Sequence, residues 1–269
     1  MSADKFFQHI ELLRCPVCGA AFSKLQNSLR CPNGHTFDPS AKGYVHFAPN
    51  AQPSRYDAAL FEARRRILNA GFYDTVIDAI RLRMPDPRGV VLDAGCGDGT
   101  FTKALQGETT VGLDLSKDAI RLAARGGGPI LWTVGDLTRL PIADGAVDTV
   151  LNLFSPAHYA EFSRVLKPNG RLLKLVPGEE YLQEIRALMG DRLKNASYSN
   201  EAVVNRLSER FSVLDRVRVT NTFRLSEAEA SDFLAMTPLT FGVDPAALDA
   251  SQLTEITVDT ELMVCRLPE

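Results

Sequence analysis

Residues 90–99 read VVLDAGCGDG, an apolar run that ends in an acid and then in a turn with glycine at alternate positions. Glycine takes backbone conformations that other residues avoid and lets the main chain come close to a ligand. A buried strand that enters such a turn and then a helix is typical of the nucleotide-binding edge of a doubly wound α/β sheet. The segment therefore predicts a parallel sheet with a ligand site at the carboxyl end of its first strand.

Apolar runs and helical patterns alternate around this segment. Strands are predicted at 90–93, 109–113, 130–134, 147–151 and 170–176, and helices at 56–70, 72–84, 116–125 and 156–166. Such alternation implies a parallel sheet with helices on both faces. Two later strand patterns, at 212–220 and 261–267, predict that two final strands, one of them antiparallel, close the sheet.

Acidic residues stand after the second and third predicted strands. Asp114 lies 19 positions beyond Gly95, where a doubly wound sheet places an acid that binds ribose hydroxyls. Asp136 can accept a hydrogen bond from an adenine amino group. The turn reads GxGxG rather than the GxGxxG of dinucleotide enzymes. In the following LPIADGAVD run, Asp144 and Asp148 are interpreted as helix caps or solvated turn residues.

Taken together, these motifs resemble, in kind and in order, those of the class I S-adenosylmethionine-dependent methyltransferases. The resemblance implies a Rossmann-like α/β sheet, mostly parallel with an antiparallel last strand, and S-adenosylmethionine at its carboxyl edge. It implies the following cofactor contacts: Asp93, Gly95, Gly97, Gly99, Asp114, Leu115, Asp136 and Leu137. In that assignment the methionine part lies on the glycine turn, the ribose at Asp114 and the adenine at Asp136.

The N-terminal cysteines form a separate pattern. Cys15 and Cys18 make a CxxC turn, and twelve residues later Cys31 and His35 make a CxxxH turn. Three thiolates and one imidazole complete the closed tetrahedral shell of a structural zinc site. The sequence predicts a small zinc-ribbon domain here, with His46 as an alternative fourth ligand.

Cysteine usage and charge indicate the compartment and the class of partner. The five cysteines are an odd number, the N-terminus has no secretory signal, and no apolar run approaches the length that spans a bilayer. A cytoplasmic protein with no membrane partner is expected, with Cys96 and Cys265 as small core residues. The net charge is −3, but residues 1–88 carry 12 basic and 8 acidic residues, which favours this part for an anionic partner.

The zinc motif in front of this fold carries a second resemblance. CPVCG and CPNGHTFD within 15–38, KGYVHF at 42–47, FEARRRILNAGFY at 61–73 and MTP at 236–238 resemble segments of the large-subunit ribosomal RNA guanine-N1 methyltransferases. The resemblance covers nearly the whole chain. It implies methyl transfer from S-adenosylmethionine to N1 of a guanine in a hairpin loop of 23S rRNA, by a zinc-containing enzyme that forms a homodimer.

The same resemblance implies roles for further residues. Additional cofactor contacts are Tyr73, Thr102, Lys103 and Tyr181, although some family members have histidine in place of the last of these. The NLFSP run at 152–156 loosely resembles the Asn-Pro-Pro-Tyr motif of amino-directed methyltransferases. The expected catalytic residues are Asn152, Ser155 and Pro156, of which the first is also a cofactor contact.

This assignment divides the chain into three units. Residues 1–50 form a zinc-binding RNA-recognition module, residues 51–88 a helical linker that contributes to the cofactor site, and residues 89–269 the methyltransferase domain. The run Arg64, Arg65 and Arg66 is hypothesised to help guide the RNA. Two alternatives stay open: a methyltransferase that acts on a quinone-like or other small metabolite, and a non-catalytic zinc-ribbon RNA-binding protein whose cofactor domain is a scaffold.

Overall fold

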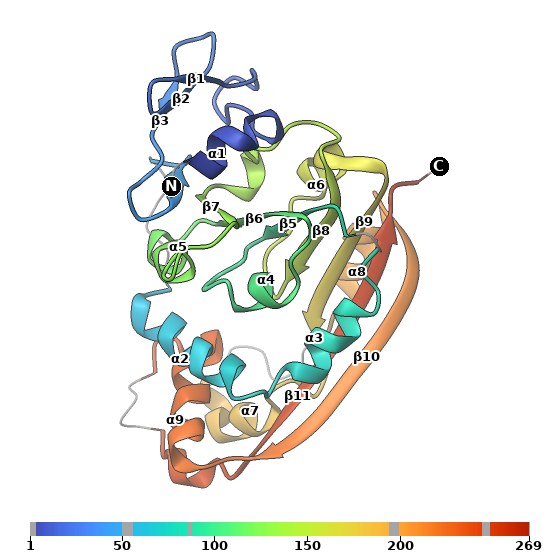
Figure 1. The fold of residues 1–269 in the computed structure, drawn as a ribbon. Helices are drawn as coiled ribbons and strands as arrows, with labels where there is room; N and C mark the ends of the chain where they lie inside the picture. The colour runs from blue at the N-terminus through green and yellow to red at the C-terminus, as the bar shows by residue number, and fades with distance from the viewer. Residues whose placement is uncertain (1–3, 50–55, 86–87, 194–198, 244–247, 269) are drawn as a thin grey trace.

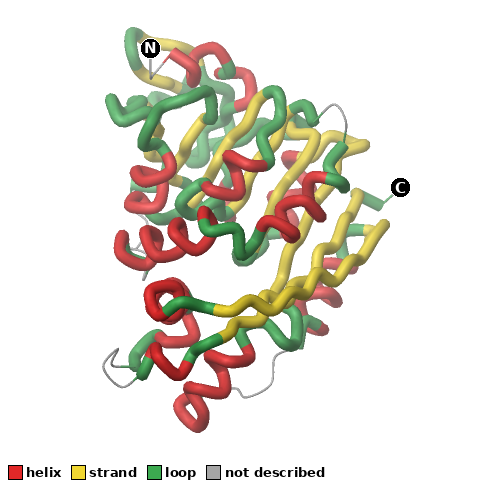
Figure 2. The backbone as a smooth tube through the Cα atoms, turned by 60° about the horizontal axis from the view of Figure 1, so that its bottom comes forward, coloured by secondary structure: helices red, strands yellow, loops and turns green. Residues whose placement is uncertain are grey.

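The computed structural model describes residues 4–49, 56–85, 88–193, 199–243 and 248–268 (Figure 1). The expected boundary between residues 50 and 51 lies outside the described residues. A central twisted sheet has helices on both sides (Figure 2). None of the helices in the described part of the chain is long and apolar enough to cross a membrane.

Eight strands form the central sheet in the order β10-β11-β9-β8-β5-β6-β7-β4. Their bounds are β4 Tyr44–His46, β5 Val90–Ala94, β6 Thr109–Asp114, β7 Leu131–Val134, β8 Val147–Leu153, β9 Leu166–Pro177, β10 Ser212–Arg224 and β11 Glu255–Arg266. Only β11 runs antiparallel to its neighbours β9 and β10. The predicted fold class, a mostly parallel sheet closed by an antiparallel last strand, is confirmed.

The central strands are buried because both faces of the sheet are covered. Successive side chains of a strand point to opposite faces. The neighbours Val91 and Leu92 of β5 accordingly belong to two different hydrophobic cores, one on each face of the sheet. The covering helices are α2 Ala58–Asn69, α3 Asp74–Arg81, α4 Thr100–Ala104, α5 Lys117–Ala123, α6 Tyr159–Val165, α7 Gln183–Met189, α8 Glu201–Ser208 and α9 Glu227–Met236. The hydroxyl of Ser116 caps α5 by accepting a hydrogen bond from the backbone N–H of Ala119.

The zinc ribbon is built from α1 Asp4–Gln8 and a small sheet of β1 Ser23–Leu25, β2 Ser28–Arg30 and β3 Thr36–Phe37. The strand that follows it, β4, pairs in parallel with β7 and becomes the edge of the central sheet. A second seam joins residues 12–14 to residues 141–143 through backbone bonds from Arg14 N to Pro141 O and from Ala143 N to Leu12 O. The ribbon and the sheet therefore share one continuous hydrophobic core.

Candidate active site and metal centre

The four predicted metal ligands come together in the ribbon. Sγ of Cys18 lies 3.7 Å from Sγ of Cys31, and Nδ1 of His35 lies 3.3 Å from Sγ of Cys31 and 3.6 Å from Sγ of Cys15. Tetrahedral zinc, with bonds of about 2.0–2.3 Å, needs ligand atoms separated by roughly 3.3–3.8 Å. The cluster therefore fits a zinc ion, and of the described residues it includes these four and not His46, which lies in β4.

A cavity of about 530 Å³ opens at the carboxyl ends of β5, β6 and β8, a size typical of small-molecule sites. Ten residues predicted from the sequence line it: Tyr73, Gly95, Gly97, Asp114, Leu115, Asp136, Leu137, Ser155, Pro156 and Tyr181. The glycine turn, the acid that ends β6 (Asp114) and the acid that follows β7 (Asp136) thus meet in one cavity. Their chemistry fits a nucleoside with an amino-acid side arm.

The glycine turn is shaped by its neighbours. Gly95 has φ +93°, and a Cβ atom there would lie 2.5 Å from Cβ of Ser155 and would overlap its Oγ atom. Oδ2 of Asp114 accepts a hydrogen bond from Gly97 N at 2.9 Å, and Oδ1 accepts one from Ser116 N at 2.8 Å. Burial raises the pKa of Asp114. Each carboxylate oxygen has a second lone pair with which it can accept from a ligand hydroxyl.

Five predicted residues do not line the cavity: Asp93, Gly99, Thr102, Lys103 and Asn152. Oδ2 of Asp93 accepts a hydrogen bond from Oγ1 of Thr102 at 2.6 Å, and its buried Oδ1 has no partner among the described residues. Burial raises the pKa of Asp93 to about 7. Nζ of Lys103 lies 5.6 Å from the ring centroid of Trp132. The side chains of Asp93, Thr102 and Lys103 therefore contact other protein side chains and not the cavity.

An aromatic wall borders the cavity, and two of its members, Tyr73 and Tyr181, were predicted from the sequence whereas Phe154 was not. The hydroxyls of Tyr73 and Tyr181 lie 2.7 Å apart, and the ring of Phe154 stacks on that of Tyr181 with centroids 5.4 Å apart. Phe154 has φ +52°, which is strained for a residue with a side chain. It belongs to residues 152–156, here termed the acceptor loop. The NLFSP run at 152–156 is the sequence signal for this loop, and the catalytic residues predicted from it are Asn152, Ser155 and Pro156, not Phe154.

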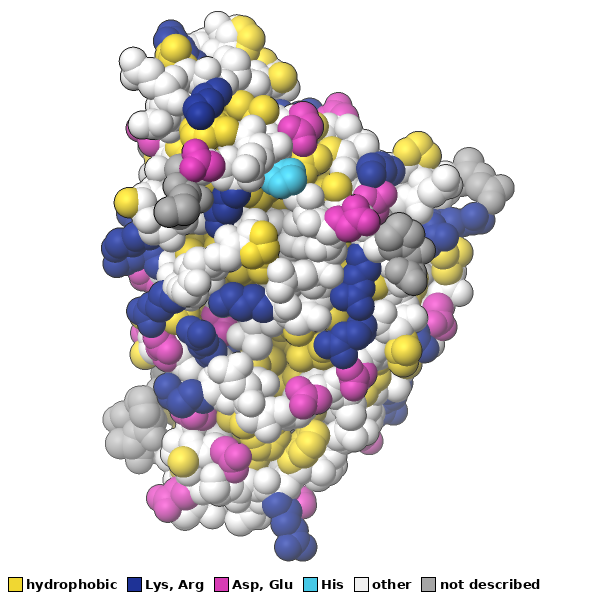
Figure 3. Space-filling model, viewed as in Figure 1, with side chains coloured by type: hydrophobic (Ala, Val, Ile, Leu, Met, Phe, Trp, Pro, Cys, Tyr) yellow, Lys and Arg dark blue, Asp and Glu magenta, His cyan; other side chains and the backbone are white. Residues whose placement is uncertain are grey.

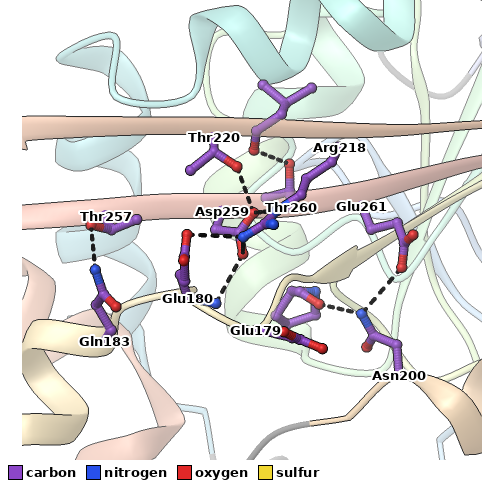
Figure 4. A network of polar contacts seen from close by, with 12 residues as sticks. Glu179, Glu180, Gln183, Asn200, Arg218, Thr220, Thr257, Asp259, Thr260 and Glu261 are labelled. Carbon is purple, nitrogen blue, oxygen red and sulfur yellow. Dashed lines mark hydrogen bonds and ion pairs between the residues drawn. The ribbon is translucent and has the colours of Figure 1, made fainter.

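The segment before Tyr181 is held by a buried carboxylate (Figure 4). Asp259, on β11, accepts hydrogen bonds from Nε of Arg218 at 2.8 Å, Oγ1 of Thr220 at 2.7 Å and the backbone N–H of Glu180 at 2.9 Å. The backbone N–H of Gly178 donates to the carbonyl of Asp259 at 2.8 Å. The last two strands, β10 and β11, thus position Tyr181, which lines the cavity. No local sequence pattern reveals this connection.

The three consecutive arginines, Arg64, Arg65 and Arg66, make different contacts. Arg64 lines the cavity and donates a hydrogen bond to the carbonyl of Met236 at 3.2 Å. Arg66 forms a two-pronged ion pair with Asp232 of α9. Among the described residues, Arg65 makes neither a hydrogen bond like that of Arg64 nor an ion pair like that of Arg66. The lining residues that the sequence did not assign to the site include Cys96, Asp98, Phe101, His158, Thr237 and Pro238, of which the last two belong to the MTP run that carries the family resemblance.

Comparison with known proteins identifies both parts of the chain. A family model described as the N-terminal region of RlmA, a zinc ribbon, matches residues 13–54, and one described as a methyltransferase domain matches residues 92–174. A solved chain from the Haloferax volcanii complex between the Trm112 methyltransferase activator and a methyltransferase aligns with a TM-score of 0.55. It covers 81% of this chain and 100% of its own at 19% identity, which shows the fold.

Two sequence relatives extend over almost all of the chain. The Bacillus subtilis protein YxjB, assigned as a 23S rRNA (guanine-N(1)-)-methyltransferase, is 35% identical over 94% of this chain and 96% of its own. The 23S rRNA (guanine(748)-N(1))-methyltransferase of Streptomyces fradiae is 30% identical over 96% of this chain and 97% of its own. The chain therefore belongs to the 23S rRNA (guanine-N1-)-methyltransferase family of S-adenosylmethionine-dependent enzymes, with an N-terminal structural zinc ribbon.

Proposed function

We propose that this chain transfers the methyl group of S-adenosylmethionine to N1 of a guanine in a hairpin loop of 23S rRNA. One observation carries the proposal: a zinc-ligand cluster and a cavity walled by the glycine turn and two acids occur in one continuous structure. A small-metabolite methyltransferase has no evident use for the ribbon. A non-catalytic scaffold has no evident use for a cavity of this composition.

The donor side of the cavity is assigned from chemistry. Asp114 would accept hydrogen bonds from the ribose hydroxyls, Asp136 and the backbone of Leu137 would hold the adenine, and Tyr73 and Tyr181 would border the methionine part. When bound, the donor supplies an electrophilic sulfonium methyl. In the transfer the S–CH3 bond breaks as the N1–CH3 bond forms, S-adenosylhomocysteine leaves as a neutral thioether, and the proton of guanine N1 is released to solvent. Because the leaving group is neutral, we expect positioning by the protein to supply much of the acceleration.

The acceptor side is assigned to the end of β8 and the turn after it. Guanine N1 lies on the Watson–Crick edge, so the base must be unpaired or extruded to react. Ser155 and Pro156 line the cavity there, and the ring of Phe154 offers a stacking surface. Nδ1 of His158 accepts a hydrogen bond from Glu161 N at 3.3 Å, so a neutral His158 carries its proton on Nε2 and can donate it to the base.

The RNA side follows from charge and from the ribbon. Lys and Arg side chains gather over α2 and α3 on the face shown in Figure 3. Arg65 is the member of the arginine run that we assign to the RNA, because Arg64 lines the cavity and Arg66 is paired. We further propose that residues 1–50 contact the hairpin, that the enzyme works as a homodimer, and that it acts in the cytoplasm, where ribosomal RNA is made.

The test uses labelled donor, the purified zinc-replete protein and 23S rRNA from a strain that lacks the modification. Incorporation should map to one guanine, where a methyl group on N1 blocks primer extension. Asp114→Asn should weaken donor binding, whereas Asp118→Asn, on the exposed face of α5, should not. Label in a metabolite extract instead of the RNA, or no label at all, would reject the proposal. Light scattering of the same preparation tests the homodimer.

A further inference from the structure

Lys174 is a buried cation that the site assignment does not use. It lies in β9, is 4% exposed, and does not line the cavity. Its Nζ atom donates hydrogen bonds to Oδ1 of Asn152 at 2.6 Å and to the carbonyl of Ser155 at 2.6 Å. No ion pair of Lys174 occurs within the described part of the chain. Burial lowers the pKa of Lys174 to about 8.

The two acceptors of Lys174 belong to the acceptor loop. Lys174 and Asn152 are direct partners in the register of β9 and β8, so the lysine lies beneath the point where the loop leaves the sheet. The amide of Asn152 in turn donates to the carbonyl of Ala94 at 2.8 Å and to that of Pro156 at 3.0 Å. Lysine, asparagine and the glycine turn thus form one connected network.

The acceptor loop has a conformation that needs such support. Phe154 has φ +52°, and strain of this kind costs of order 1–3 kcal/mol and persists only where the surroundings impose it. The backbone bond from Phe154 N to the carbonyl of Leu175 is 3.1 Å long and holds one side of the loop. The ammonium of Lys174 holds the other side by gathering Asn152 and Ser155 onto a single donor group.

Stability alone does not account for a lysine here. A buried ammonium that meets only neutral acceptors loses its hydration and gains no opposite charge in return. An apolar side chain of similar length would fill the same space without that cost. The acceptors that it leaves without this donor would cost about 1–3 kcal/mol, so the two effects on stability roughly offset one another. The loop that the ammonium fixes, however, brings Ser155 against Gly95 and Phe154 against Tyr181, between the donor and acceptor sides of the cavity.

We propose that Lys174 is a positioning residue that holds the acceptor loop in its strained, reactive geometry through Asn152 and Ser155. It touches neither donor nor acceptor, and acts on the transfer through the loop alone. The proposal rests on the proposed function only where it speaks of catalysis. The geometry of the loop can be measured without any substrate.

The first measurement is hydrogen exchange on the full-length zinc-replete protein. Lys174→Met should speed exchange of the backbone amide of Phe154 at least tenfold, while the midpoint of thermal unfolding stays within about 3 °C of the parent or rises. Lys167→Met, at the other end of β9, removes a partly buried ion pair with Asp148 and should leave loop exchange unchanged. Unchanged exchange of Phe154 in Lys174→Met would overturn the proposal, whatever the enzyme methylates.

The second measurement is a kinetic cycle with RNA. Lys174→Met should lower kcat about 10- to 100-fold, since a displacement of about 1 Å is enough for such a loss, and should change the Kd of S-adenosylhomocysteine less than threefold. Lys174→Arg, which keeps charge and donors, should retain more of kcat. Asn152→Ala should add little to Lys174→Met, because both act on one network. Additive losses of kcat in the double variant, or a kcat of Lys174→Met within twofold of the parent, would refute the positioning role. If the parent protein itself methylates no RNA, the proposed function is refuted instead.

Discussion

Gly95→Ala tests how closely the acceptor loop packs on the glycine turn. The change adds a methyl group at φ +93°, which costs about 1–2 kcal/mol for a residue with a side chain. The new Cβ atom would also lie 2.5 Å from Cβ of Ser155, and overpacking of this kind costs about 1–3 kcal/mol. The expected loss of unfolding free energy is therefore about 2–5 kcal/mol, or a fall of roughly 4–9 °C in the melting temperature of a chain this long.

A matched control separates the two contributions. Gly126→Ala introduces the same methyl at φ +91°, but nothing lies within 4 Å of the added atom, so it should cost only the backbone strain. Ser155→Gly combined with Gly95→Ala should recover the packing contribution. Thermal and urea unfolding, with calorimetric titration of S-adenosylhomocysteine, measure both stability and donor binding. Equal costs for Gly95→Ala and Gly126→Ala would refute the close approach between turn and loop.

Three further results are expected. Removing zinc with a chelator should lower the melting temperature and weaken donor binding, reversibly on zinc addition. The reason is that the backbone bond from Arg14 N to Pro141 O joins the ribbon to the segment that follows the cavity residues Asp136, Leu137 and Thr138. Unchanged donor affinity would contradict this. Asp93→Asn should flatten the pH dependence of stability between about pH 4 and 7. In this range the raised pKa of Asp93 makes the parent lose up to about 1.4 kcal/mol of unfolding free energy per pH unit as pH rises. Urea unfolding at several pH values measures this, and the same pH dependence in parent and variant would argue against it. Asp259→Asn should cost about 1–3 kcal/mol and free the Glu180 amide for hydrogen exchange; a protected amide would rule out the role.

The parts of the fold that follow from local pattern were predictable. The strand into the glycine turn, the acids at the ends of β6 and β7 and the cap at Ser116 each depend on residues close together in the sequence. The zinc cluster was predictable for the same reason, since each pair of ligands lies within one tight turn. These features required no knowledge of what packs against them.

The parts that were missed depend on long-range partners. The run at 44–46 is too short to signal a strand, and only its pairing with β7 makes it one. Lys174 reads as one charge in an apolar strand, and its meaning appears only when Asn152 is found beside it in the sheet. Asp259 binds Glu180 across 79 positions of sequence. Spacing along the chain carries no information about such contacts.

The edge position of β4 bears on how this enzyme can be dissected. A truncation that starts after residue 50 would remove that strand together with the ribbon and leave the amides and carbonyls of β7 unpaired along one side. Bare strand edges recruit other chains, so the shortened protein should aggregate rather than behave as an independent catalytic half. Grafting the ribbon onto another methyltransferase would likewise require that the edge strand of its sheet be unpaired, so that β4 could pair with it.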